Sequence, residues 1–171
     1  FGLPSNLHIL GTMKTAHRSI ALLDTALRRR FEFKEIEPDP ETLRDAALRC
    51  GLDLPKILRV INDRIEYLYD REHRIGHAYV IGCASRNDVD QTMRHKVIPL
   101  LAEYFFEDWH KVAAVLGDAE AHEGPVIGGF LKRELLKAPP GMDSEADGPT
   151  RFRWSLKDAD EGFDYTRLTS Q

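Results

Sequence analysis

Residues 54–69 read LPKILRVINDRIEYLY, and this stretch decides the fold of the central part of the chain. Its apolar side chains recur at spacings of three and four, which places them on one face of a helix. These side chains are Leu54, Ile57, Leu58, Ile61, Ile65 and Leu68. The opposite face is polar, so the stretch predicts an amphipathic α-helix that packs against other helices.

Helical patterns flank this stretch on both sides. Residues 41–50 are predicted to form a helix, and Gly51 follows at the position where glycine commonly ends one. Residues 88–116 carry a second long helical periodicity, with Pro99 near the middle as a kink or break. The whole region 39–118 therefore predicts a helical subdomain.

The first forty residues have a different pattern. Residues 7–13 (LHILGTM) form a short apolar run that predicts a buried strand, and residues 20–27 (IALLDTAL) predict a compact helix. Residues 31–36 (FEFKEI) alternate apolar and polar side chains, which is typical of a strand with one wet face. The order strand, helix, strand predicts the end of an α/β sheet. The expected fold class is α/β followed by all-α.

The C-terminal part carries weaker signals. Residues 124–137 predict a short helix, residues 138–150 an exposed linker rich in Pro, Gly, Asp and Ser, and residues 151–154 a strand. The remaining end is polar and is expected to be mobile. Residues 119–171 are therefore predicted to form a partly flexible extension.

The composition is that of an ordinary globular protein. The 171 residues include 24 Lys and Arg against 28 Asp and Glu, a net charge of −4, which argues against a dedicated polyanion binder. Two cysteines, Cys50 and Cys83, are too few for a disulfide scaffold and lack metal-type spacing, so we interpret them as packing residues in a reducing, cytoplasmic setting. No apolar run reaches the roughly 18–20 residues of a membrane span. Because Phe1 comes before the first methionine, Met13, the chain is expected to be a piece of a longer protein.

Three separated motifs resemble AAA+ NTPase modules, and more narrowly the McrB-type GTPase subunit of restriction systems that cut 5-methylcytosine DNA. The motifs are LGTMKTAHRS with LLDTALRRRF (residues 10–19 and 22–31), RIGHAY (74–79) and IPLLAEYFFEDW (98–109). The resemblance covers roughly residues 1–118. It implies that residues 1–38 are the last strands of a AAA+ P-loop NTPase core and that residues 39–118 are its helical lid subdomain.

The resemblance also implies cofactors and partners. The intact protein would bind GTP or ATP with Mg²⁺ at the interfaces of a homo-oligomeric ring, and hydrolysis would drive a nuclease subunit. DNA would be contacted only indirectly, and no membrane is involved. The chain contains no Gly-x-x-x-x-Gly-Lys-Ser/Thr loop and no apolar strand ending in paired acidic residues, both of which the family places upstream of Phe1. We therefore expect this chain alone to hold no nucleotide cofactor and to be inactive.

Four arginines on either side of the predicted helix at residues 20–27 are candidate catalytic groups. The resemblance implies that one or two of Arg28, Arg29 and Arg30 reach the nucleotide of a neighbouring subunit as an arginine finger. A planar guanidinium matches phosphate oxygens two at a time, and Arg18 supplies a further cation. The alternative is that the three arginines only complement a helix dipole at a solvated surface.

Two positions depart from the family signature, which has Asn where this chain has Lys14 and Asp where it has His17. Asn can orient an attacking water, whereas lysine has no acceptor, and His17 removes an acidic partner for Arg18. Lys14 and His17 therefore join the candidate catalytic positions, with weakened or lost hydrolysis predicted unless other residues compensate. The alternative function is a non-catalytic, degenerate AAA+ interaction module. A third reading, an unrelated helical interaction domain, would be favoured if residues 7–36 formed no parallel strands.

Arg74, Gly76 and His77 are the candidate cofactor-binding residues. The resemblance places them in the lid, near where such modules sense the nucleotide. The alternative is that His77 and Tyr79 are simply packed or hydrogen-bonded near a turn. No metal site is predicted, because His73 and His77 have no third ligand close in sequence.

Overall fold

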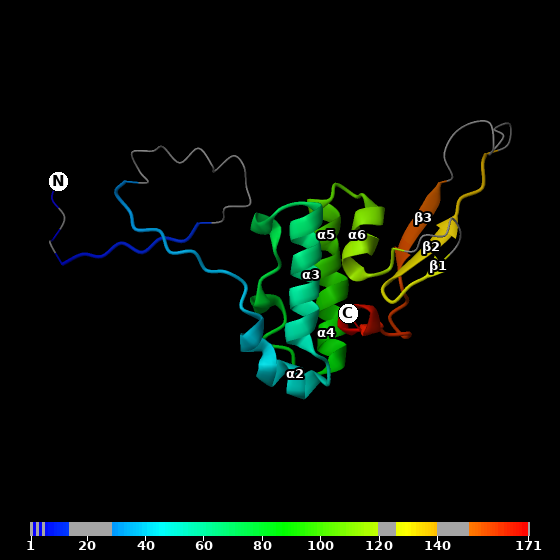
Figure 1. Cartoon of the computed structure of the whole chain (residues 1–171), viewed down its shortest axis with the longest axis horizontal. Helices are drawn as coiled ribbons and strands as arrows, with labels where there is room; N and C mark the ends of the chain where they lie inside the picture. Colours follow the sequence, from blue (N-terminus) through cyan, green and yellow to red (C-terminus); the bar gives the residue numbers. More distant parts are fainter. Residues whose placement is uncertain are drawn as a thin grey trace. The chain divides into compact units, whose positions relative to one another are not determined.

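The computed structural model describes residues 2, 4, 6–13, 29–119, 126–139 and 151–170. The chain divides into two units, Phe1–Ile36 and Glu37–Gln171 (Figure 1). The second unit contains all the helices and strands assigned within the described ranges. None of those helices is both long enough and apolar enough to cross a membrane.

The second unit is mainly helical. Its helical elements, with η marking 3₁₀-helices and one π-helix, are η2 (Pro40–Leu43), α2 (Arg44–Cys50), α3 (Leu54–Leu68), η3 (Arg71–His73), η4 (His77–Tyr79), α4 (Arg86–Thr92), η5 (Met93–Val97, the π-helix), α5 (Ile98–Tyr104), α6 (Trp109–Leu116) and α7 (Thr166–Thr169). The predicted helices at 41–50 and 54–69 are confirmed. Gly51 ends α2 with a left-handed backbone (φ 64°), as predicted.

Helix α3 is the centre of this unit. The side chain of Asp53 accepts a hydrogen bond from the backbone N–H of Lys56 (3.1 Å) and so caps the helix, while Pro55 occupies the first turn. The predicted apolar face is buried, and the helix packs against α2, α6 and α7 and against the turns η2 and η3. The core around it contains the largest fully buried side chains of the unit, among them Leu43, Leu54, Ile65, Ile98, Leu101 and Leu116.

The predicted long helix at 88–116 is interrupted twice. The π-helical turn η5 precedes Ile98 and Pro99, and the backbone is helical on both sides, so Pro99 lies inside a continuous helical stretch whose regular hydrogen bonding is interrupted there. The chain then leaves the helix after Tyr104 and turns through Phe106 (φ 52°) and Glu107 (φ 61°) before α6 begins. The interruption near Pro99 is confirmed, whereas the sharper break seven residues later was not predicted.

The predicted helix at 124–137 is wrong. Strands β1 (Val126–Ile127), β2 (Leu131–Leu135) and β3 (Phe152–Leu156) form an antiparallel sheet in the order β1-β2-β3. Strand β2 pairs with β3 over its full length, from Leu131 opposite Leu156 to Leu135 opposite Phe152. The spacing of apolar residues in this stretch fits both periods, and pairing with a distant strand decides between them. The strand predicted at 151–154 is confirmed.

The end of the chain is also not the mobile tail that its polar composition predicts. Phe163, Tyr165 and Leu168 are all buried. The rings of Phe163 and Tyr165 each lie 5.2 Å from the ring of Phe130, and the Tyr165 hydroxyl donates a hydrogen bond to Asp90 on α4 (2.6 Å). A few large side chains thus anchor a polar segment to the helices. The predicted linker at 138–150 lies mostly outside the described residues.

The two strands predicted in the first unit are not formed. Residues 7–13 and 31–36 have no assigned strand, and their apolar side chains are exposed, with Leu10 at 97% and Ile36 at 86%. A strand needs the backbone of a neighbour to satisfy its N–H and C=O groups, and no strand pairing involves the described residues of this unit. The predicted helix at 20–27 lies outside the described residues.

Candidate functional site

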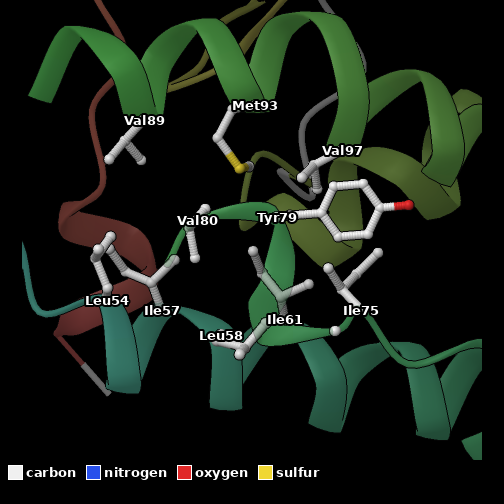
Figure 2. A pocket seen from close by; sticks show the side chains of 11 residues that line it. Leu54, Ile57, Leu58, Ile61, Ile75, Tyr79, Val80, Val89, Met93 and Val97 are labelled. Carbon is white, nitrogen blue, oxygen red and sulfur yellow. The ribbon is translucent and has the colours of Figure 1, made fainter. Parts of the chain in front are cut away.

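The RIGHAY segment, residues 74–79, is held between two helices. Ile75 and Val80 are buried, and Figure 2 shows them with Tyr79 between the side chains of α3 and those of α4 and η5. The gap among these apolar side chains has a volume of about 20 Å³, room for one water without polar partners. It is therefore a packing gap, and Arg74 and His77 are not among the residues that line it.

Asn62 fixes the backbone of this segment. Its side-chain Nδ2 donates to the carbonyl oxygen of Ile75 (2.9 Å), and its Oδ1 accepts from the N–H of Ile75 (2.6 Å). Asn62 is buried on α3, so both bonds are shielded from water. The neighbouring Arg74 and Gly76 are thereby held in place. Sequence reasoning missed Asn62, although an amide next to Ile61 on the buried face of a helix is a signal that could have found it.

Arg74 is the best-positioned of the candidate residues. Its Nη2 donates to Oε1 of Glu37 (3.0 Å), its Nε donates to the carbonyl oxygen of Arg71 (3.0 Å), and its Nη1 lies 3.9 Å from Oε2 of Glu66. The side chain is 21% exposed. A cation is therefore fixed at the edge of the helical unit, with part of its surface open to solvent.

A second arginine shares the same acceptor. Nη2 of Arg71 donates to Oε1 of Glu37 at 2.6 Å, so two guanidinium groups meet at one carboxylate oxygen. The hydrogen bond and charge of Arg74, followed by the charge of Arg71, hold the pKa of the Glu37 carboxyl below its usual value. Neither Glu37 nor Arg71 was predicted as a site residue. Their neighbours Pro38 and Asp70 gave no indication that these distant segments meet.

His77 is hydrogen-bonded, as its alternative interpretation predicted. Its Nδ1 accepts from the backbone N–H of Asp39 (3.0 Å), and the Asp39 side chain in turn accepts from the N–H of Glu41 and caps η2. Gly76 is extended, and a Cβ there would meet no atom within 4 Å. Arg74, Gly76 and His77 thus lie along one segment. Residues 37–39 lie beside it, with Glu37 bonded to Arg74 and Asp39 bonded to His77.

The predicted catalytic residues belong to the first unit. Arg29 and Arg30 are exposed in a turn. Lys14, His17, Arg18 and Arg28 lie outside the described residues. The roles of all six remain predictions.

His73 belongs to a separate packed cluster. Its Nδ1 is 2.7 Å from Oδ1 of Asp70, and its ring contacts those of Tyr69 and Tyr104 edge-on at 4.3 and 4.7 Å. Burial raises the pKa of the Asp70 carboxyl, but the hydrogen bonds and charge of His73 outweigh it, so the pKa lies below its usual value. Within the described ranges, no three His, Cys, Asp or Glu side chains are grouped to hold a metal ion.

Comparison with known proteins gives the helical unit a family. Residues 53–113 match the family described as the McrB α-helical lid domain. Over 130 residues the chain is 34% identical to the EcoKMcrB subunit of a type IV methyl-directed restriction enzyme from Escherichia coli (strain K12). That alignment covers 65% of this chain, which spans only 28% of the length of the relative. The family match covers the helices from α3 to α6, so it weighs against an unrelated helical domain even though residues 7–13 and 31–36 form no strand. Residues 53–113 are a McrB-type α-helical lid domain, and the chain is a McrB-like protein.

Proposed function

We propose that this chain supplies the lid of a McrB-like AAA+ NTPase of a restriction system, and that Arg74 senses the phosphates of its nucleotide. In the intact protein, GTP or ATP with Mg²⁺ binds at the interfaces of a homo-oligomeric ring. Hydrolysis there drives a nuclease subunit, and one or two of Arg28, Arg29 and Arg30 complete the neighbouring site. The observation that carries this proposal is the fixed, partly open guanidinium of Arg74 on the lid.

Phosphoryl transfer depends mainly on positioned groups and on charge stabilisation, so a lid contributes by holding a cation in place. Asn62 and the buried Ile75 provide that positioning for Arg74. The bidentate geometry of a guanidinium suits phosphate oxygens better than a point charge does. The relative is named as a subunit of a type IV methyl-directed restriction enzyme, and this name supports the proposed assignment to a restriction system.

The test is nucleotide turnover by the full-length protein with Arg74→Ala. Removing one preorganised donor from a transition state costs about 100-fold in kcat, and we expect a loss of that order. Arg74→Lys should recover only part of it, because lysine cannot make the same two-pronged contact. Ring assembly should be unchanged in both variants.

The matched control is Arg59→Ala, also a lid arginine paired with a glutamate, here Glu41 (2.7 Å). Its turnover should stay within about twofold of the unmodified protein, as expected for an exposed surface pair. Equal turnover in the Arg74→Ala and Arg59→Ala proteins would refute the sensing role of Arg74.

The chain by itself should be inactive. We expect no Mg²⁺-dependent release of phosphate from GTP or ATP by the 171-residue chain, because it contains no phosphate-cradling loop. Nucleotide hydrolysis by the purified chain that is lost in its Arg74→Ala variant would contradict the expected inactivity.

The second candidate function is a non-catalytic interaction module, and the residues at Lys14 and His17 are the observation that favours it. Lys14→Asn and His17→Asp together restore the family signature in the full-length protein. A large gain in turnover supports a degenerate site in the natural protein. Robust turnover that the double variant leaves unchanged excludes it.

A further inference from the structure

We propose that Arg71 and Arg74 form a binding site for a phosphate group, that the carboxylate of Glu37 occupies this site in the structure described, and that an arriving phosphate displaces it. The inference rests on the proposed function, since the phosphate is taken to be that of a nucleotide. It adds a second arginine to the site and a built-in competitor that regulates it.

The geometry around Glu37 is that of an anion site. The Nη2 atoms of Arg71 and Arg74 lie 2.6 and 3.0 Å from the same oxygen, Oε1. Guanidinium N–H groups form strong, charge-assisted hydrogen bonds to phosphate and carboxylate oxygens, and here two guanidinium groups donate to the same oxygen. The Glu37 carboxylate therefore stands where a phosphate oxygen would sit.

Glu41, another glutamate with two arginine partners, has a different arrangement. Glu41 also binds two arginines, but Arg59 contacts its Oε1 and Arg44 its Oε2, so each arginine has an oxygen of its own. Both pairs are exposed, and both glutamates have a pKa lowered mainly by hydrogen bonds from their arginines. Glu41 is therefore a close control for Glu37, matched in charge, exposure and number of partners.

The two sides of the contact differ in how firmly they are held. Asn62 fixes the backbone next to Arg74, and the Nε of Arg74 is bound to the carbonyl oxygen of Arg71. The side chain of Glu37 is 53% exposed. Exposed ion pairs contribute little, so moving the carboxylate aside is inexpensive. Arg74 is therefore the fixed member of the contact, whereas the side chains of Glu37 and Arg71, 53% and 48% exposed, are the ones that can adjust.

Displacing Glu37 affects the first residues of the second unit. Glu37 is the first residue of the second unit, directly after Ile36. The next tie to this segment is the bond from the Asp39 N–H to His77. A phosphate that replaces the carboxylate removes the contact at Glu37 and leaves the bond from Asp39 to His77 in place.

The test is a titration of the 171-residue chain with inorganic tripolyphosphate at low salt, followed by NMR of the arginine Nε–H groups. In Glu37→Gln the side chain that competes with phosphate is neutral. We expect about fivefold tighter binding of tripolyphosphate, because one exposed ion pair no longer has to be broken. Glu41→Gln should leave the affinity unchanged. Arg71→Ala in the Glu37→Gln background should abolish the gain, and raising the salt concentration should reduce it.

An equal gain in Glu37→Gln and Glu41→Gln would overturn the inference, since it would reflect net charge alone. So would no gain in Glu37→Gln, provided that circular dichroism shows both variants folded. The outcome is separable from that of the proposed function. A tripolyphosphate site with the expected behaviour supports this inference even where Arg74→Ala leaves turnover of the full-length protein unchanged, a result that refutes only nucleotide sensing.

Discussion

Helix α3 and residues 31–36 both carry regular apolar patterns, yet one is buried and the other is exposed. Ile65 on α3 has no exposed surface, whereas Ile36 is 86% exposed. A helix closes its backbone hydrogen bonds within its own segment, while a strand depends on a neighbour to do so. A periodic pattern therefore predicts the helix α3 without knowledge of its partners, whereas a strand at residues 31–36 cannot be predicted without knowing its neighbour.

The sheet supports the same explanation. Strand β3 has a mixed, short pattern that resembles residues 31–36, but it pairs over five residues with β2. Its Trp154 and Leu156 pack against the core of the second unit. The two stretches differ because β3 has a partner strand and residues 31–36 have no strand paired with them within the described residues. Four predictions test how far this difference extends.

The largest effect is expected for Ile65→Ala. Truncating a fully buried isoleucine removes apolar contacts and leaves a cavity, which lowers the free energy of unfolding by about 2–5 kcal/mol. Urea unfolding of the chain, followed by circular dichroism, measures this. The control is Ile36→Ala, which should change stability by less than about 0.5 kcal/mol. A comparable loss in both variants would remove the distinction between the two stretches.

The second prediction concerns how the hairpin is joined to the helices. Both carboxylate oxygens of Asp118, whose side chain is 1% exposed, accept backbone N–H groups, those of Gly129, Phe130 and Leu131 at 2.7–2.8 Å. Asp118→Ala leaves these buried donors without their acceptor, at a cost of about 2–3 kcal/mol.

Hydrogen exchange of the amides of residues 129–131 should accelerate in Asp118→Ala more than exchange within α3 does. Asp63→Ala, which removes an exposed carboxylate, is the control and should leave both regions unchanged. If residues 129–131 stay protected in Asp118→Ala, the hairpin is held by packing alone.

A smaller effect is expected at the start of α4. The Ser85 hydroxyl accepts from the N–H of Asp88 (3.2 Å), and the Asp88 carboxylate accepts from the N–H of Ser85 (3.0 Å), a reciprocal capping box. Ser85→Ala should lower stability by about 1 kcal/mol in thermal unfolding. Ser155→Ala, at an exposed position of β3, should have no effect. Equal melting temperatures for the two variants would mean that local capping is not needed by these helices.

The smallest effect is a dependence on pH through Asp70. Because its pKa is lower in the folded chain than in the unfolded chain, its stabilising contribution is complete above the unfolded value, about 3.9, and is lost as the pH falls through the folded value. Asp70→Asn should therefore flatten the decline of stability at acidic pH. Denaturant midpoints measured from pH 6 downwards test this, and parallel curves for the two proteins would contradict it.

What the sequence could predict follows from the range of the interactions. The face of α3 and the turn at Gly51 depend on neighbours within a few residues, and both were predicted. The strand β2 depends on residues about twenty positions away, and the contact between Glu37 and Arg74 joins residues 37 positions apart. Such contacts are fixed by tertiary packing, which a periodic pattern does not report. The three motifs identified the lid, and the structure supplied the partners of Arg74.

In the function that we propose, the lid responds to nucleotide through the segment around Arg74. The most direct measurement is hydrogen exchange of the full-length protein with and without GTP and Mg²⁺, or ATP and Mg²⁺. Slower exchange in residues 71–80 on nucleotide binding, lost in Arg74→Ala and kept in Arg59→Ala, is the predicted result. Unchanged exchange in residues 71–80, in a protein that demonstrably binds the nucleotide, would show that this segment does not sense it.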